Sequence, residues 1–324
     1  MKTVLLVGQG ITALAALESL AERFHVAGVI RSAGVAENAD EVQRRAEEFK
    51  IPVLSDVSLE GLRRAISEQQ PDCVVVSSYD RILGPQVLDQ SRFVNVHYSP
   101  LPEYRGRANV NWAIINGEPE AAITVHVLTG ELDAGNILFQ KSVKIGSRDT
   151  VGDLYKVLND IQRDVLGETI ERYLAGYAGV PQDPSAATYG CTRIPADGEI
   201  DWSAPTERIY ALIRALSAPY PSAHTYIGLH RISILRAEPV PDGPRYVGRV
   251  PGRVVARRPG SGSVDVLTAD GILRIYQVAT EDSEVRPASA VIRSTKQTLG
   301  LRTADLLERI GELSRQVELL TRGD

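Results

Sequence analysis

The sequence has little of several things that would mark a specialised class of protein. Its 324 residues include two cysteines, five histidines and two tryptophans, and acidic side chains outnumber basic ones by 41 to 36. Two separated cysteines are too few for a disulfide framework or a cysteine-rich zinc site. The acidic balance argues against a dedicated nucleic-acid-binding protein, which needs a basic surface to contact phosphates.

Long hydrophobic stretches are absent as well. No run approaches the roughly 18 apolar residues that a membrane-spanning helix requires. The apolar run at residues 3–7 is shorter than the core of a signal peptide and is followed by glycines. With 43% hydrophobic and 24% charged residues, the composition is that of a globular protein. We therefore expect the protein to be cytoplasmic.

Strand and helix patterns alternate through the first half of the chain. Short apolar runs predict strands at residues 3–7, 26–31, 52–54, 73–77, 93–96 and 123–128. Leucines and other apolar residues at helical spacing predict helices at residues 12–23, 40–49, 59–68 and 153–175. Right-handed crossovers on a mostly parallel sheet are the simplest topology for this order. The pattern therefore predicts an open α/β sheet over about the first 190 residues.

The composition changes beyond residue 190. A loop-rich stretch is followed by a predicted helix at 206–215 and then by short β-like runs at 223–227, 231–237, 252–257, 263–267 and 271–277. Evenly spaced short strands are typical of a small barrel or sandwich. We expect a first domain at 1–190, a linker with a small β-rich domain at 191–302, and a tail helix at 303–324.

The tail carries a heptad pattern. Leu306, Ile310, Leu313, Val317 and Leu320 are spaced alternately four and three residues apart. Leucine occupies the d positions and β-branched residues the a positions, a choice that favours parallel two-stranded pairing. An amphipathic helix of this kind can also dock on its own domain. Both interpretations stay open, and we expect a homodimer.

A glycine turn, Gly8-Gln9-Gly10, follows the first predicted strand. A dinucleotide-binding fingerprint tolerates an alanine at its last position, which is Ala13 here. The acidic residue expected near the end of the second strand is missing, because that strand ends in Arg31. A tight turn that starts a helix is favoured, and nicotinamide binding is the weaker alternative.

The sharpest chemical signal lies on the strand at 93–96 and in the loop after it. Asn95 and His97 are two positions apart, so on a strand their side chains point to the same face, here at the carboxyl end. An amide can donate to a developing oxyanion and an imidazole can move a proton, which together suit acyl transfer. Arg105 and Arg107 in the following loop could hold an anionic group. A structural histidine beside a solvated loop is the alternative.

A third element lies downstream. Thr124 and His126 share a strand face, and Asp133 opens a glycine-containing turn. A carboxylate here could orient or stabilise the imidazole of His97, whereas we expect a structural role for His126. The other three histidines have no spacing that suggests metal ligation.

Together these elements resemble the 10-formyltetrahydrofolate-dependent formyltransferases. The similar stretches are residues 95–106, 112–118 and 124–137. The chain layout also resembles the long members of the family, which have a Rossmann-like catalytic domain and a small β-barrel-like C-terminal domain. The resemblance implies that residues 1–190 form the formyltransferase catalytic domain. It further implies 10-formyltetrahydrofolate as co-substrate and a reaction without a metal.

The resemblance also implies roles for individual residues. The catalytic residues would be Asn95, His97 and Asp133. The folate would lie between segments 79–83 and 127–133, and its binding residues would be Arg81, Ile82, Leu83, Glu131 and Asp133. The residues on the substrate side would be Ser99, Tyr104, Arg105 and Arg107.

Within the family, the pattern is most similar to sugar nucleotide N-formyltransferases, such as the enzyme that acts on UDP-4-amino-4-deoxy-L-arabinose. The tRNA-directed members carry a basic insertion where residues 31–41 here have one cation and three carboxylates. The expected acceptor is therefore the amine of a UDP- or dTDP-linked amino sugar, and the sequence does not name the sugar. Methionyl-tRNA, another small amine, hydrolysis of the formyl donor, and folate binding without turnover are the alternatives.

Overall fold

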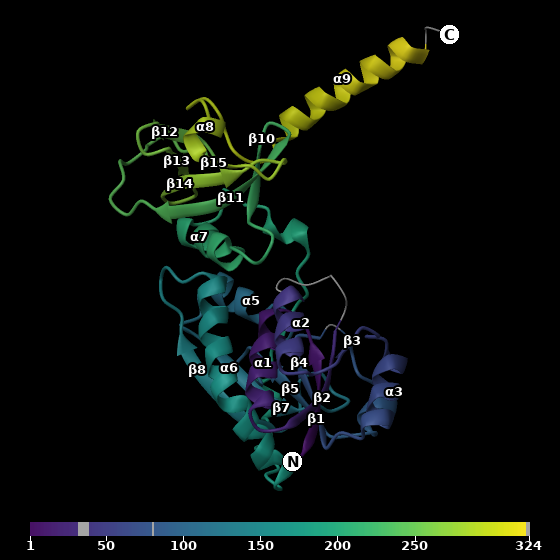
Figure 1. Ribbon diagram of the computed structural model, residues 1–324. Helices are drawn as coiled ribbons and strands as arrows, with labels where there is room; N and C mark the ends of the chain where they lie inside the picture. The colour runs from purple at the N-terminus through teal and green to yellow at the C-terminus, as the bar shows by residue number, and fades with distance from the viewer. Residues whose placement is uncertain (32–38, 80, 322–324) are drawn as a thin grey trace. The chain divides into compact units, whose positions relative to one another are not determined.

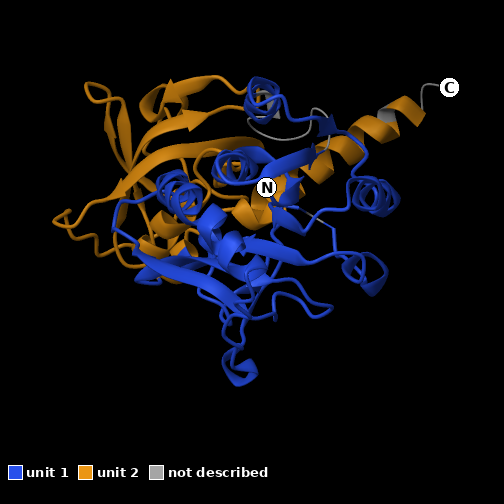
Figure 2. Ribbon diagram, turned by 60° about the horizontal axis from the view of Figure 1, so that its bottom comes forward, with its two compact units in different colours: residues 1–113, 118–193 blue, residues 114–117, 194–324 orange. Residues whose placement is uncertain are grey.

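The computed structural model describes residues 1–31, 39–79 and 81–321 (Figure 1). The chain divides into two compact units, coloured separately in Figure 2. Unit 1 comprises Met1–Ala113 and Glu118–Arg193, and unit 2 comprises Ile114–Gly117 and Ile194–Asp324. Three sequence predictions fall partly outside the described residues: the acidic stretch 31–41 at residues 32–38, segment 79–83 at residue 80, and the tail helix 303–324 at residues 322–324.

Unit 1 is built on a seven-stranded sheet with the order β3-β2-β1-β4-β5-β7-β8. The strands are β1 (Thr3–Gly8), β2 (His25–Ile30), β3 (Val53–Leu54), β4 (Cys73–Ser77), β5 (Phe93–His97), β7 (Glu120–Val127) and β8 (Ile137–Lys144). The pairs from β3 to β5 are parallel, whereas β7 and β8 run antiparallel to their neighbours. This confirms the predicted open, mostly parallel α/β sheet. Strand β8 was not predicted.

Helices cover this sheet (Figure 1). They are α1 (Gly10–Ala21), α2 (Ala39–Glu48), α3 (Leu59–Gln69), α4 (Pro85–Leu88), α5 (Asn109–Asn116) and α6 (Val151–Leu174). Helix α1 packs against α2 and α6, while Leu62 and Ile66 of α3 belong to the same core cluster as Leu5 and Val7 of β1. A capping box between Thr150 and Asp153 starts α6. Short helices α4 and α5 were not predicted.

The glycine turn after β1 has a packing reason. A Cβ on Gly8 would lie 1.8 Å from the carbonyl oxygen of Ser77 on neighbouring β4. Only glycine therefore allows the two strand ends to approach this closely. This contact explains Gly8 without any nucleotide.

Unit 2 contains a six-stranded sheet. Its strands are β10 (His224–Ile227), β11 (His230–Pro239), β12 (Val254–Arg258), β13 (Ser263–Leu267), β14 (Ile272–Ala279) and β15 (Val285–Pro287). Their order is β10-β11-β14-β13-β12, with β15 beside β14. Leu299 bridges to Ile227 at one edge and Thr298 bridges to Arg253 at the other. The two edges are thus joined, as the predicted β-barrel-like domain requires.

Two α-helices of unit 2 lie before and after the main strands. Helix α7 (Thr206–Ala215) has the predicted bounds, and α8 (Ala288–Val291) follows β15. Ile209 and Ile213 of α7 pack with Trp202 and with residues of the sheet to form the core of this unit.

The tail forms helix α9 (Thr303–Thr321). Its five seam residues are between 38% exposed, at Leu306, and 77% exposed, at Leu320. Docking on its own domain would have buried this seam, and the described chain leaves it uncovered. Among the described residues, no helix combines the length and the apolar character needed to cross a membrane.

Candidate active site

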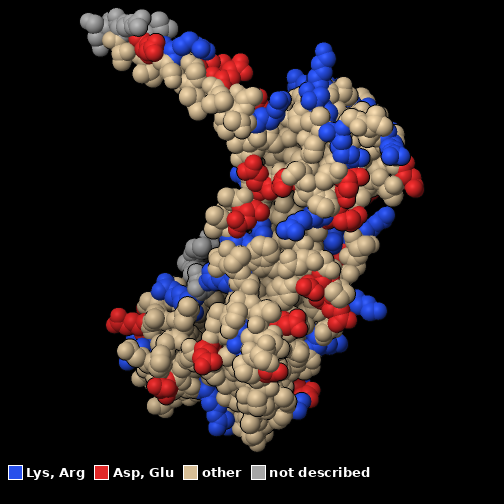
Figure 3. All heavy atoms as spheres, turned by 180° about the vertical axis from the view of Figure 1, so that it is seen from behind, with Lys and Arg blue, Asp and Glu red and all other residues tan. Residues whose placement is uncertain are grey.

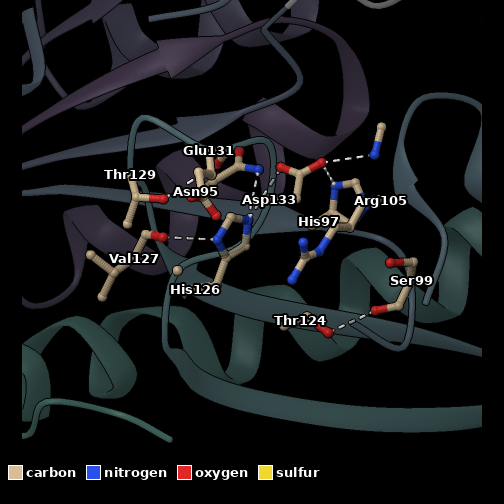
Figure 4. A network of polar contacts seen from close by, with 12 residues as sticks. Asn95, His97, Ser99, Arg105, Thr124, His126, Val127, Thr129, Glu131 and Asp133 are labelled. Atoms are coloured by element: carbon tan, nitrogen blue, oxygen red, sulfur yellow. Dashed lines mark hydrogen bonds and ion pairs between the residues drawn. The ribbon is translucent and has the colours of Figure 1, made fainter. Parts of the chain in front are cut away.

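The register between β5 and β7 places the first pair of site residues. These strands run antiparallel, with Asn95 opposite His126 and His97 opposite Thr124. The side-chain nitrogen Nδ2 of Asn95 lies 3.2 Å from Nε2 of His126 (Figure 4). Because directly paired residues on neighbouring strands bring their side chains together, this contact follows from the strand register itself.

The hydrogen bonds of His126 define its tautomer. Its Nδ1 lies 2.9 Å from the carbonyl oxygen of Val127, which can only accept a hydrogen bond. Nδ1 therefore carries a proton, and Nε2 lies between two groups, Nδ2 of Asn95 at 3.2 Å and Oδ1 of Asp133 at 3.5 Å. This arrangement orients the Asn95 amide, and His126 is fully buried behind it.

His97 is buried at the end of β5 and presents Nδ1 to Asp133. The distance from Nδ1 to Oδ2 of Asp133 is 3.7 Å, and Nε2 lies 2.8 Å from Nδ2 of Asn109 and 3.0 Å from the carbonyl oxygen of Tyr104. Burial lowers the pKa of His97. The negative charge of Asp133 raises this pKa and the neighbouring His126 lowers it further, and the net shift is downward. The ring is therefore neutral near pH 7 and can accept a proton.

Asp133 lies in a tight turn that holds its carboxylate against both histidines. Its backbone is in the left-handed region, with φ of 49°, and Oδ2 accepts a hydrogen bond of 2.9 Å from the N–H of Gly106. Oδ1 lies 3.5 Å from Nε2 of His126. Burial would raise the pKa of Asp133, but contacts with His126 and His97 and the Gly106 N–H outweigh it and lower the pKa to about 2. The carboxylate is thus ionised at neutral pH.

The three predicted catalytic residues are therefore brought into one cluster (Figure 4). Asn95 offers an oriented amide, His97 a neutral imidazole, and Asp133 a carboxylate that stabilises that imidazole once it is protonated. A hydrogen-bond donor beside a base supported by a carboxylate can stabilise an oxyanion and move a proton. This chemistry fits transfer of an acyl group between two nucleophiles.

The four residues predicted on the substrate side lie in the loop after β5. Ser99 donates to the carbonyl oxygen of Glu103, and the hydroxyl of Tyr104 donates to Glu118 at 2.5 Å. Ser99 and Tyr104 line a cavity of about 230 Å³. Arg105 is only 5% exposed, whereas Arg107 is exposed. Their contacts with substrate stay predictions.

The residues predicted to bind folate lie on two segments. Arg81, Ile82 and Glu131 are exposed, whereas Leu83 is buried in a core cluster. Leu128 packs against that same cluster. The structure therefore brings parts of segments 79–83 and 127–133 to one core, and the folate contacts themselves stay predictions.

Two residues with polar contacts at the site were missed from the sequence. Asn109, at the start of α5, contacts His97, and Gln182, in the loop after α6, contacts the backbone of the Asp133 turn. Neither residue carries a sequence signal that would have revealed this. Among the described residues, no group of three or more His, Cys, Asp or Glu side chains is arranged to hold a metal ion.

Comparisons with protein families match both halves of the chain. The model described as formyl transferase matches residues 1–170, and the model described as formyl transferase, C-terminal domain, matches residues 194–296.

Three solved structures show a similar fold at low sequence identity. The N-formyltransferase from Helicobacter canadensis, in complex with folinic acid and dTDP-3-aminofucose, has a TM-score of 0.64 and 21% identity, covering 85% of this chain and 98% of its own. HypX from Aquifex aeolicus, in complex with tetrahydrofolic acid, has a TM-score of 0.66 and 19% identity over 91% of this chain. This chain spans about half of HypX, 47% of its length. A sugar N-formyltransferase from a Shewanella species has a TM-score of 0.56 and 21% identity, covering 69% and 92% of the two chains.

Proposed function

Because the chain belongs to the formyl transferase family, we propose that it moves the formyl group of 10-formyltetrahydrofolate to the amine of a nucleotide-linked amino sugar. The observation that carries this proposal is the cluster of half-buried Asn95 with buried His97 and Asp133, in a chain that matches both family models. The cluster supplies an oxyanion donor, a base and a carboxylate to stabilise the protonated base.

The cluster accounts for each step of the transfer. The neutral amine attacks the formyl carbon, and the amide of Asn95 donates to the oxygen that becomes negatively charged. His97 accepts the proton that the new C–N bond releases from the amine, and the charge of Asp133 stabilises the imidazolium. His97 then gives this proton to the folate nitrogen as its bond to the formyl carbon breaks. No covalent enzyme intermediate is needed.

The two segments assigned to folate carry exposed apolar side chains. Ile82 is 82% exposed and Leu132, next to Asp133, is 51% exposed. Exposed apolar side chains on segments that share one core cluster fit the flat, largely apolar face of a pterin ring. They support a folate co-substrate at this site.

A nucleotide sugar is favoured over a tRNA as the acceptor. The N-formyltransferase from Helicobacter canadensis is in complex with a dTDP-linked amino sugar. Basic and acidic side chains are interspersed over the face of unit 1 that Figure 3 shows. A tRNA-binding surface would instead gather cations to contact phosphates.

A formyl-transfer assay tests the proposal. It would use 10-formyltetrahydrofolate with a panel of UDP- and dTDP-linked 3-amino and 4-amino sugars, and formate release would be measured in parallel. Formylation of one amino sugar supports both the reaction and the acceptor class. Formate without a formylated product would identify a hydrolase instead. Folate binding without either product would leave methionyl-tRNA and small amines as the next acceptors to assay.

We also propose that the protein forms a homodimer through α9. The seam of Leu306, Ile310, Leu313, Val317 and Leu320 is exposed in the described chain, and its residue types at a and d suit a second copy of the same helix.

A further inference from the structure

One segment contacts both loops of the catalytic cluster. It follows α6 and runs from Val180 to Gly190 within unit 1. At one end, Val180 and Ile137 exchange backbone hydrogen bonds of 2.8 and 2.9 Å just after the Asp133 turn. At the other end, β9 (Tyr189–Gly190) pairs in parallel with β6 (Arg105–Gly106). The segment thus links the turn that carries Asp133 to the loop that carries Gly106.

Gln182 makes the central contacts of this segment. Its Nε2 donates two hydrogen bonds of 2.8 Å, to the backbone carbonyl oxygens of Asp133 and Gly135. Its Oε1 accepts a hydrogen bond of 2.8 Å from Nη2 of Arg105. Since the guanidinium can only donate and the two carbonyls can only accept, these partners fix the orientation of the amide.

The Asp133 turn depends on such external contacts. The left-handed conformation of Asp133 is uncommon for a residue with a side chain and persists only where the surroundings hold it. Gly135 allows the turn to lie against the carbonyl of Val127, which a Cβ would approach to 1.9 Å. Gln182 holds the backbone of this turn, and the N–H of Gly106 holds its carboxylate.

Arg105 acts on this turn through Gln182. The side chain is 5% exposed, and its Nε finds no acceptor among the described residues. Its Nη2 contacts Gln182, and its Nη1 lies 3.5 Å from the hydroxyl of Tyr189. A hydrogen bond from a charged donor is stronger than one between neutral groups. Arg105 therefore holds the amide of Gln182 in the orientation that binds the turn.

We propose that Gln182 is a positioning residue for proton transfer. It holds the backbone turn that places the Asp133 carboxylate against His97, and Arg105 holds the side chain of Gln182. This inference rests on the proposed function and deepens it. Under this proposal, Arg105 supports the position of the Asp133 carboxylate rather than binding the substrate.

The test compares three variants. Gln182→Met keeps the volume of the side chain and removes its hydrogen bonds. Gln182→Glu keeps an acceptor for Arg105. It replaces the amide nitrogen by an oxygen, which cannot donate to the carbonyls of Asp133 and Gly135. Asn136→Ala is the matched control, because the amide of Asn136, which follows Gly135, donates to the carbonyl of Ala178 at 2.9 Å rather than to the carbonyl of Asp133 or Gly135.

The first measurement is the titration of His97 by NMR, which needs no substrate. Among the described residues, the titratable groups that face His97 are Asp133 on its turn and His126 on β7. The negative charge of Asp133 raises the pKa of His97, so displacing that carboxylate lowers it. We expect Gln182→Met, which adds no charge, to titrate His97 at lower pH than wild type, and Asn136→Ala to match wild type. An unchanged His97 titration in folded Gln182→Met overturns the proposal.

The second measurement is the kinetics of formyl transfer. We expect kcat to fall on the order of 10²-fold in the Gln182 variants, since displacement by about 1 Å costs this much, while KM for both substrates changes little. A rise in KM with kcat unchanged would overturn the proposal and return Arg105 to substrate binding. A shifted His97 titration in a protein that formylates nothing would support the positioning role and reject the proposed function.

Discussion

Asn95 and His126 face each other across β5 and β7, with Nδ2 of the asparagine 3.2 Å from Nε2 of the histidine. The same Nε2 lies 3.5 Å from Oδ1 of Asp133. If Nε2 carries no proton, it accepts a hydrogen bond from the Asn95 amide. If Nε2 is protonated, it donates a hydrogen bond to Asp133, and its N–H then faces the N–H of the Asn95 amide. The orientation of the Asn95 amide therefore depends on His126, the residue directly opposite it.

The first prediction concerns the catalytic residues. Asn95→Ala removes an oxyanion donor and His97→Ala removes the base, so each should lower kcat by at least about 10²–10³-fold. Steady-state assays of formyl transfer would measure this, with circular dichroism and thermal unfolding as checks on folding. Near-wild-type turnover in either folded variant would contradict the roles assigned to these two residues.

The second prediction concerns the positioning of Asn95. His126→Phe fills the buried space but removes the acceptor that orients the amide, so kcat should fall by less than in Asn95→Ala. If His126 acts through Asn95, the double variant should be no slower than Asn95→Ala alone. Fully additive losses in the double variant would show that His126 acts by another route.

The strands of the sheet were predictable because their apolar runs are continuous. Every residue of β4 is buried, and the prediction for that strand has the observed bounds. Strand β8 escaped prediction because only Leu138 along it is buried and four of its eight residues are exposed. Helix α5 is a short element of eight residues between two loops, which gave too few turns for a periodic pattern.

The site was predictable only as far as side-chain chemistry shows in the sequence. Asn95, His97 and Asp133 are reactive types in a recognisable spacing. Gln182 contacts backbone carbonyls 47 and 49 positions earlier in the chain. Any residue supplies a carbonyl, so no pattern of residue types marks such a contact. The burial of Arg105 likewise depends on the pairing of β6 with β9, which joins residues 84 positions apart.

The third prediction concerns stability at acid pH. The pKa of Asp133 is lowered from 3.8 to about 2, so its contribution to stability is present above about pH 4 and is lost as the pH falls toward 2. Wild type should therefore lose about 1 kcal/mol more than Asp133→Asn between pH 5 and pH 3. Urea unfolding of both proteins at the two pH values measures this difference. Equal losses would show that the native structure does not favour the ionised carboxylate.

The last prediction concerns α9. If two copies pair along its seam, light scattering should give twice the 35.3 kDa mass of the chain, and truncation after Thr303 should give the mass of one chain. Leu313→Lys places a charge at a d position and should act like the truncation, because a buried, unpaired cation is costly. Glu308→Lys changes charge at an exposed f position on the opposite face and is the matched control. A dimer that survives both truncation and Leu313→Lys would place the contact elsewhere, and a full-length monomer would reject the homodimer itself.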